Sequence, residues 1–380
     1  MNVNQMKNLN GDNEIVIVGG GVSGLAVSLA LHRKGIRSVV LERADSIRVT
    51  GVNITIYTNG WRALEQLGIA SQLRSTAVRI QLRRDISLDD HHEKLTPSGK
   101  EEIRCLRRRD LVETLANELP PETIKFGHHI VAIGTDSCTS YPIIYLHNGK
   151  IIKPKIVIGC DGVNSKVSKY LGLKPPAYHS VGSYRGFTSY VDGHGFGSEF
   201  VEMKKGNTVM GRAPINENLV CWFLAKIWNG TPFNLYVGSD CAYTLSHPSY
   251  MSTDADISKD SKMMKLSALE AIKDFPSEMV DMVRQSDLNS LSLSRIRHRS
   301  LKEVALNNFR RGNVTVAGDA MHVMGPYFGQ GGCSALEDAI VLARSMVREM
   351  RVKEEVEFGK VRVAFDNDVN GPAQYDCGNL

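Results

Sequence analysis

The sequence lacks several features that define whole classes of protein. No stretch of its 380 residues approaches the roughly 18 apolar residues that a membrane-spanning helix requires. The first 13 residues are polar, with neither the apolar stretch of a signal peptide nor the arginine-rich pattern of a transit peptide. Repeats and low-complexity linkers are also missing. We therefore expect a cytoplasmic globular protein with no integral membrane association.

Cysteine pairs with metal-binding spacing are missing as well. The seven cysteines are scattered and form no CxxC pair, which suits a reducing compartment and argues against disulfides and a structural zinc site. His91 and His92 are adjacent, but they lie in a charged stretch without a second ligand cluster, so we interpret them as a solvated turn and expect no metal. A net charge of +5 is only mildly basic and is no signature of nucleic-acid binding.

The first informative pattern is a glycine-rich turn near the N-terminus. The apolar run from Glu14 to Val18 predicts a buried parallel strand, and the motif Gly19-Gly20-Gly21-Val22-Ser23-Gly24 opens a helix directly after it. In such a GxGxxG motif, Gly19 permits the tight turn, Gly21 permits close approach of a pyrophosphate, and Gly24 permits close packing of helix and strand. The pattern predicts a dinucleotide site.

An acidic residue follows this turn at the distance expected for ribose binding. The segment from Arg37 to Leu41 predicts a second strand, which completes a βαβ unit and ends at Glu42. Glu42 lies 18 residues beyond Gly24, where its carboxylate can accept hydrogen bonds from both ribose hydroxyls. We include the neighbouring Arg43 in the predicted cofactor site.

A second glycine-rich stretch lies near the other end of the chain. The predicted strand 314–317 ends in Gly318-Asp319, which places a carboxylate at the edge of the sheet where ligands bind. The loop that follows contains Pro326, Gly329, Gln330, Gly331 and Gly332 and leads into a predicted helix. Its free N–H groups and positive dipole end suit a reduced flavin ring.

Between these two glycine-rich stretches the hydrophobic pattern of the sequence changes. The segment from about Val181 to Trp228 is rich in β patterns and predicts a separate antiparallel sheet, with two helices after it near 262–273 and 276–284. The segment 80–95 predicts a solvent-facing hairpin. The chain thus leaves its nucleotide domain, builds a second domain and returns.

Together the motifs resemble the single-component flavoprotein monooxygenases, a family that includes salicylate and para-hydroxybenzoate hydroxylases and zeaxanthin epoxidase. Within it the chain is most similar to plant FAD-dependent monooxygenases. Gly159-Cys160-Asp161-Gly162 resembles the family's DG motif, which serves both FAD and the nicotinamide cofactor, and Gly318-Asp319 resembles its GD motif, which binds the ribityl chain. Arg108 matches the arginine that starts a helix beside the ribityl chain and pyrophosphate.

The chain departs from the family pattern at three places. Ser168 stands where the DG motif commonly ends in arginine, which puts cofactor or interdomain contacts there in question. Cys333 stands where many relatives have asparagine. The segment 351–380 is polar and does not resemble the family's arginine-rich closing helix.

The resemblance implies an α/β fold: a Rossmann-like domain that binds FAD and NAD(P)H, with an inserted domain of antiparallel sheet and helices for the substrate. We expect the FAD domain to comprise residues 1–78, 101–177 and 291–350, and the substrate domain residues 79–100 and 178–290. The implied reaction uses NAD(P)H and O2 to hydroxylate or epoxidise a small aromatic or polycyclic substrate through a C4a-hydroperoxyflavin. The flavin carries the chemistry, so no side chain is expected to act as a catalytic acid or base.

Several questions stay open at the level of sequence. A flavin-dependent reductase or oxidase, or a non-catalytic binding protein, could use the same fold. Arg295, Arg297 and Arg299 share one face of a predicted strand. That face could be exposed to solvent or could be a basic binding surface for NAD(P)H. Five residues of the second sheet could line a substrate pocket, namely Tyr184, Arg185, Met210, Arg212 and Phe223. We expect His322 to be structural and to bond to backbone. The substrate, the choice between NADPH and NADH, and the oligomeric state are not encoded in any motif.

Overall fold

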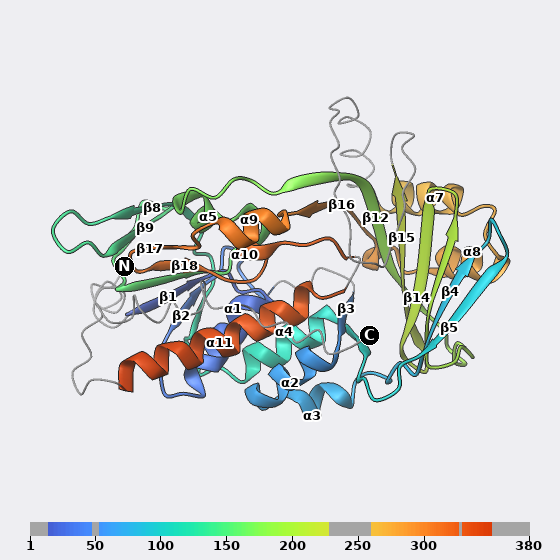
Figure 1. Cartoon of the computed structure of the whole chain (residues 1–380), viewed down its shortest axis with the longest axis horizontal. Coiled ribbons are helices and arrows are strands. Elements are labelled where there is room, and N and C mark those ends of the chain that lie inside the picture. The colour runs from blue at the N-terminus through green and yellow to red at the C-terminus, as the bar shows by residue number, and fades with distance from the viewer. Residues whose placement is uncertain (1–13, 48–52, 228–259, 327–328, 352–380) are drawn as a thin grey trace.

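The computed structural model describes residues 14–47, 53–227, 260–326 and 329–351 (Figure 1). Two sheets dominate it, at opposite ends of the long axis. The predictions about the first 13 residues and about the polar tail beyond residue 351 lie outside the described residues.

The first sheet is a largely parallel sheet buried between two layers. Its strand order is β17-β18-β11-β1-β2-β7, and only the pair β17/β18 is antiparallel. The strands are β1 (Ile15–Val18), β2 (Val39–Leu41), β7 (Ile124–Lys125), β11 (Ile156–Gly159), β17 (Arg310–Arg311) and β18 (Val314–Val316).

Strand β1 shows why this sheet needs cover on both faces. Ile15 and Ile17 belong to a core formed with helices, whereas Val16 and Val18 belong to a second core on the other face. Successive side chains of a strand point to opposite faces, so a fully apolar strand requires two apolar layers. The helices of the first layer are α1 (Val22–His32), α2 (Thr58–Leu67), α3 (Ala70–Arg74), α4 (Arg108–Asn117) and α11 (Gly331–Arg351).

The second layer is a small sheet with a short helix. It consists of β8 (Ile130–Thr135), β9 (Pro142–Leu146), β10 (Ile151–Ile152) and α5 (Lys166–Tyr170). A separate two-stranded ladder, β3 (Asn53–Ile56) with β6 (Arg104–Arg107), runs toward the second large sheet. The short elements are η2 (Gly162–Asn164), η3 (Leu288–Ser290), α9 (Leu301–Leu306) and α10 (Asp319–His322).

The second large sheet has seven strands in the order β16-β12-β15-β14-β13-β4-β5. These are β4 (Leu82–Ser87), β5 (His92–Pro97), β12 (Ala177–Ser189), β13 (Glu199–Lys205), β14 (Thr208–Asn216), β15 (Leu219–Ile227) and β16 (Ser292–His298). Helices α7 (Ser261–Ala271) and α8 (Ser277–Gln285) pack on one face of it. The other face looks toward the first sheet.

Most predicted elements are present. The predicted hairpin is β4/β5, and the two helices predicted after the second sheet are α7 and α8. One expectation needs refinement, because β13 pairs with β4 in parallel and the second sheet is therefore mixed rather than purely antiparallel. Among the described residues, no helix is long and apolar enough to cross a membrane.

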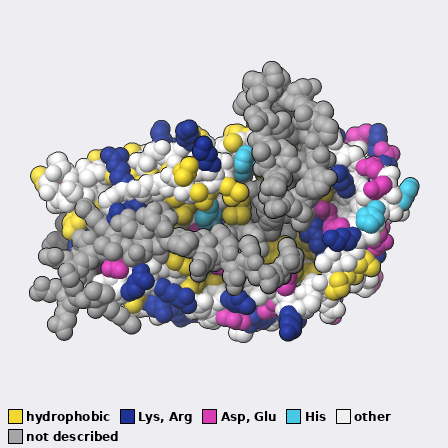
Figure 2. Space-filling model, viewed as in Figure 1, with side chains coloured by type: hydrophobic (Ala, Val, Ile, Leu, Met, Phe, Trp, Pro, Cys, Tyr) yellow, Lys and Arg dark blue, Asp and Glu magenta, His cyan; other side chains and the backbone are white. Residues whose placement is uncertain are grey.

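Side chains of both signs alternate over the end of the molecule formed by β4, β5 and α8, as Figure 2 shows. The described surface there forms local ion pairs such as Arg84 with Glu93 rather than a field of one sign. This distribution agrees with the small net charge of the chain.

Candidate active site

The glycine turn lies between β1 and α1 and leaves no room for side chains. A Cβ on Gly24 would lie 1.9 Å from the Gly19 carbonyl oxygen, and one on Gly19, whose φ is 106°, would lie 2.4 Å from the Cys160 carbonyl oxygen. Helix α1 begins after Gly21 without a side-chain cap and without an acidic residue in its first turn. Its first N–H groups therefore suit an anionic phosphate.

Glu42 organises the same turn from the end of β2. Its carboxylate is buried and accepts the Gly20 N–H at 2.8 Å and the Ala44 N–H at 2.9 Å. A carboxylate has two oxygens with about four lone-pair sites in all, so it can accept several hydrogen bonds at once. Glu42 therefore shapes the turn as well as being a candidate ribose acceptor. Arg43, beside it, is exposed.

Arg108 begins α4 and reaches the glycine turn. Its Nη2 atom lies 3.8 Å from the position that a Cβ on Gly21 would occupy. It also lies close enough to Asp319 to lower the pKa of that carboxyl. The structure thus brings Arg108 between the first glycine motif and the GD motif.

The GD motif packs directly against α1. Gly318 has φ 61°, and a Cβ there would lie 2.8 Å from the Ser23 side chain. Asp319 follows as the first residue of α10 and is accessible from the cavity that it lines. Burial raises the pKa of Asp319, although His322 and Arg108 oppose this rise. No hydrogen bond of the Asp319 carboxylate occurs within the described part of the chain, and α10 has no side-chain cap.

His322 has a different partner from the one predicted. Its Nε2 contacts the Asp338 carboxylate at 2.7 Å instead of a backbone group, because α11 carries Asp338 across α10. Asp338 also accepts the Gly318 N–H at 2.7 Å. Burial alone lowers the pKa of His322, but the Asp338 carboxylate outweighs burial and the pKa rises to about 9. The histidine is a charged structural link between two helices.

The DG motif forms a tight local turn after β11. The Asp161 carboxylate accepts the Ser165 hydroxyl at 2.5 Å and the Lys166 N–H at 2.6 Å, and Gly162 has φ 76°. Burial raises the pKa of Asp161, and these hydrogen bonds oppose it. Ser168, at the position of the usual arginine, donates its hydroxyl to the Ala320 carbonyl at 2.6 Å. A short neutral contact therefore joins the DG and GD motifs here.

The loop before α11 is held against β3 and α2. A Cβ on Gly329 would lie 2.8 Å from the Tyr57 ring, and one on Gly332 would lie 2.3 Å from Ile54. The Asn59 side chain donates to the Gln330 carbonyl oxygen at 3.1 Å. Cys333 is buried, and its sulfur accepts the Tyr57 N–H at 3.4 Å. The cysteine that departs from the family pattern is thus part of this packing.

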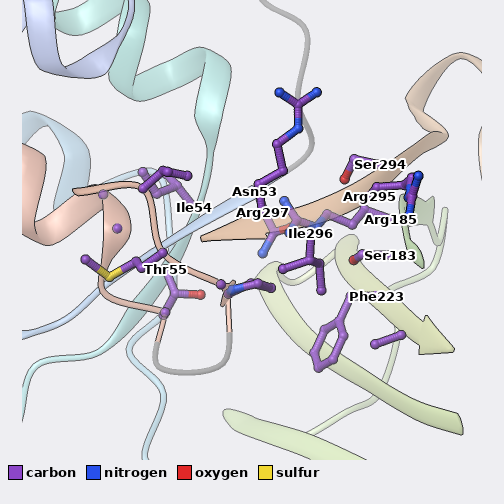
Figure 3. Close-up of a pocket in the computed structure, with 18 of the residues that line it drawn as sticks. Asn53, Ile54, Thr55, Ser183, Arg185, Phe223, Ser294, Arg295, Ile296 and Arg297 are labelled. Atoms are coloured by element: carbon purple, nitrogen blue, oxygen red, sulfur yellow. The ribbon is translucent and has the colours of Figure 1, made fainter. Parts of the chain in front are cut away.

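A cavity of about 950 Å³ separates this loop from the open face of the seven-stranded sheet. Six of the predicted site residues line it, namely Arg108, Asp319, Pro326, Gly329, Gly331 and Gly332. The other predicted residues lie outside its wall: Gly19, Gly21, Gly24, Glu42, Arg43, Asp161, Gly162, Gly318 and Gln330. Arg108 connects the cavity to the glycine turn. Figure 3 shows Asn53, Ile54 and Thr55 of β3 on one side and residues of β12, β15 and β16 on the other.

The pocket residues suggested by the sequence divide between the two faces of the sheet. Arg185 and Phe223 line the cavity, as predicted. Tyr184, Met210 and Arg212 lie on the face that α7 and α8 cover, so their prediction was wrong. The cause is strand alternation, because neighbours such as Tyr184 and Arg185 must point to opposite faces.

The three arginines near β16 also divide. Arg295 and Arg297 line the cavity and lie over the Tyr178 ring, 4.9 and 4.5 Å from its centroid. Arg299 follows the end of the strand, is buried, and donates to the Lys174 carbonyl at 2.9 Å. Two of the three therefore face the cavity, and Arg299 does not.

Sequence reasoning missed several residues of the site. Tyr57, Arg83 and Glu202 line the cavity, and Asp338 holds the GD motif. Arg83 and Glu202 come together only because β4 pairs with β13, and no local motif marks that pairing. Among the described residues, no group of three or more His, Cys, Asp or Glu side chains is arranged to hold a metal.

Comparison with known proteins identifies the class of this site. The sequence profile of the family described as "FAD binding domain" matches residues 12–355. The chain is 44% identical to "Monooxygenase 1" of Arabidopsis thaliana over 88% of this chain and 79% of that protein. It is 38% identical to "Monooxygenase 2" of the same plant over 90% of this chain and 79% of that protein.

The chain belongs to the FAD-dependent monooxygenases. Solved structures share the fold of this monooxygenase at low identity. Klebsiella pneumoniae HpxO, complexed with FAD and uric acid, has a TM-score of 0.74 at 17% identity, with 95% of this chain and 85% of that chain covered. A 2-methyl-3-hydroxypyridine-5-carboxylic acid oxygenase has a TM-score of 0.71 at 19% identity, with 95% and 88% covered.

The residues of this monooxygenase fit FAD. The glycine turn accommodates a backbone-bound pyrophosphate, and Asp319 is a carboxylate on the cavity wall that accepts no hydrogen bond from the described residues. A carboxylate in that position can accept hydrogen bonds from ligand hydroxyls. FAD supplies the redox chemistry, which amino-acid side chains cannot provide.

Proposed function

We propose that this monooxygenase uses NAD(P)H and O2 to hydroxylate or epoxidise a small aromatic or polycyclic substrate in the cavity. The observation that carries the proposal is the composition of the cavity wall. One side is the glycine loop before α11, and the other contains the Phe200 and Phe223 rings, stacked 6.0 Å apart. A flavin beside the loop would face an aromatic surface suited to a flat apolar substrate.

The predicted site residues support one placement of FAD. Glu42 would bind the ribose, the α1 N-terminus and Arg108 the pyrophosphate, and Asp319 the ribityl chain. The loop at Pro326, Gly329, Gln330 and Gly331 would lie beside the flavin ring, with the α11 N-terminus near its pyrimidine part. In this division residues 1–78, 101–177 and 291–350 serve FAD and residues 79–100 and 178–290 serve the substrate, although β16 completes the second sheet.

Arg295 and Arg297 are our candidates for the nicotinamide cofactor. Both line the cavity and stack on Tyr178, which is 53% exposed, so they mark an accessible basic entrance. Arg297 also donates to Asn164, next to the DG motif, at 2.6 Å. Guanidinium groups at this entrance suit the phosphates of NAD(P)H.

The side chains orient the reactants and exclude water rather than act as acid or base. The enclosed sheet face and the loop supply the dry surroundings that oxygen transfer requires. A reductase or oxidase would not need an aromatic surface opposite the flavin, and a pure binding protein would not need the glycine loop beside it.

Oxygen incorporation tests this proposal. We expect yellow protein whose NADPH oxidation is stimulated by some members of a library of aromatic and polycyclic compounds, with one atom of ¹⁸O₂ in each product. Stimulated NADPH oxidation that yields only hydrogen peroxide would establish an oxidase instead. The absence of any stimulated oxidation would favour a binding protein.

A variant of the loop adds a structural control. Among the described residues a Cβ on Gly331 would meet only Met324, at 3.7 Å, so Gly331→Val should fold, keep FAD and lose coupled oxygen transfer, because the side chain enters the cavity. Gly197→Val, in open space away from the cavity, should behave as the wild type.

A further inference from the structure

Arg185 differs from every other arginine that lines the cavity. It lies in β12, with its guanidinium directed into the cavity (Figure 3). Arg83 pairs with Asp85 and Glu202, Arg297 bonds to Asn164, and Arg295 stacks on Tyr178.

Within the described residues Arg185 has neither a hydrogen bond nor an ion pair, although it is only partly exposed to solvent. Burial lowers the pKa of Arg185, and no carboxylate offsets this effect. Removing a charge from water costs several kcal/mol unless a counterion is present. A guanidinium offers a planar fork of donors that matches a carboxylate in a bidentate pair. The position of Arg185 therefore requires an anion supplied by a ligand.

The neighbours of Arg185 define what is attached to that anion. In one row across the sheet, Arg185 pairs with Phe223, Phe223 with Gly211, and Gly211 with Glu202. A Cβ on Gly211 would lie 2.4 Å from the Phe223 ring, so glycine is needed for the ring to lie flat there. The row thus has a cation at one end, an aromatic surface in the middle and an acid at the other end.

The far end of the row suits a neutral donor rather than a second anion. Glu202 lies 3.5 Å from Arg83, and burial raises the pKa of Glu202 even though Arg83 opposes the rise. This carboxylate can still accept a hydrogen bond from a hydroxyl or amine. A second carboxylate would be repelled by Glu202.

The row also sets the length of the ligand that fits it. Three strand spacings separate Glu202 from Arg185, or about 14 Å. Side chains that stand roughly perpendicular to a sheet keep this spacing, so a hydrogen bond of about 2.8 Å at each end leaves roughly 8–9 Å between the outermost polar atoms of a ligand. One benzene ring is too short for this span, whereas two fused rings with polar groups at opposite ends match it.

We propose that the substrate is a fused-ring aromatic acid, with its carboxylate on Arg185, its rings on Phe223 and a hydroxyl or amine toward Glu202. This inference rests on the proposed function, since it names the substrate class of the same cavity. It makes Arg185 the residue that selects acids over neutral compounds of the same shape.

Equilibrium binding tests the assignment without depending on turnover. Calorimetric titration of the FAD-loaded chain compares 6-hydroxy-2-naphthoate, its carboxamide and 4-hydroxybenzoate. The hydroxynaphthoate should bind at least about tenfold more tightly than either of the others, as a charged bidentate pair allows. Arg185→Met should remove the preference for acid over amide, and Arg185→Lys should restore part of it. Arg284→Met, an exposed arginine on α8, should leave all three affinities unchanged.

Two outcomes would overturn the inference. One is a wild-type chain that binds the hydroxynaphthoate no more tightly than its amide, or not at all. The other is an Arg185→Met variant that keeps the acid preference but binds NADPH more weakly, which would assign Arg185 to a cofactor phosphate. Because these are binding measurements, they can fail while oxygen incorporation succeeds, and the reverse is also true.

Discussion

At the scale of single residues, Asp319 best separates a functional role from a structural one. A carboxylate at the start of a helix often serves as a cap, but α10 takes Gly318 as its N-cap and shows no side-chain cap bond. Asp319 instead lines the cavity, and its pKa is raised by burial. In the absence of a ligand its charge is therefore a cost to the fold.

Asp319→Asn should stabilise the chain freed of FAD and weaken its hold on FAD. A carboxyl whose folded pKa is raised loses stability as the pH rises through the interval between its ordinary and raised values, so the neutral amide escapes this loss at pH 7. Thermal melting of the FAD-free protein, combined with flavin absorbance after dialysis, measures both effects. A fully yellow Asp319→Asn protein would show that the ribityl assignment is wrong.

At the scale of elements, Asp338 ties α11 to α10 and to the turn after β18. It accepts the Gly318 N–H and the His322 ring with the same oxygen. Helix α11, which starts at the cavity, is thereby held against the GD motif. The charge of His322 strengthens this contact, because its pKa is raised to about 9.

The His322–Asp338 pair should make stability fall with rising pH above neutrality. A histidine with a raised folded pKa contributes fully below its ordinary value of 6.5 and loses the contribution as the pH rises through about 9. The loss should be on the order of 2–3 kcal/mol. Thermal unfolding from about pH 6 to about pH 10 measures this loss of stability.

Two variants give the control for this effect. Asp338→Asn removes the charge but keeps an acceptor for Gly318, and His322→Gln removes the titrating ring. Both should flatten the pH profile relative to the wild type. A wild-type profile with the same slope as both variants would contradict the role of this pair.

At the scale of the whole molecule, the reaction depends on contacts between segments far apart in sequence. The cavity combines β3 and the loop before α11 with the face of the seven-stranded sheet. Close to it, Cys105 of β6 and Cys221 of β15 lie with their sulfur atoms 3.2 Å apart. In our proposal NAD(P)H reaches the flavin through this junction, and Asn164, next to the DG motif, accepts a hydrogen bond from Arg297 at its edge.

Asp161→Ala should slow flavin reduction by NAD(P)H more than it weakens FAD binding. The variant also loses the hydrogen bonds from Ser165 and Lys166, which should cost about 1–2 kcal/mol of stability. Rapid-mixing absorbance at the flavin band measures reduction. Ser165→Ala is the matched control, since it removes one of the same local bonds and keeps the carboxylate. Equal slowing in both variants, or a normal rate in Asp161→Ala, would count against a role for Asp161 in the nicotinamide route.

The family, the cofactor and most of the secondary structure follow from short stretches of the sequence. The turn 19–24, Gly318-Asp319 and the loop at 329–332 are short motifs whose geometry depends on residues adjacent in the chain. The close contact at Gly24 is local, since a Cβ there would lie 1.9 Å from the Gly19 carbonyl oxygen, and it therefore leaves a signal in the sequence. Strand and helix periods are local in the same sense, so β1, α2, β4/β5, α7 and α8 were predictable.

The residues that line the cavity depend instead on how distant segments of the chain pack together. Whether Arg185 or its neighbour Tyr184 faces the cavity depends on which side of the sheet α7 and α8 cover, and a strand pattern alone leaves both faces possible. Glu202 meets Arg83 through the parallel register of β13 on β4, which joins segments more than a hundred residues apart. Such pairings are set by burial summed over the whole sheet, so no stretch of neighbouring residues records them.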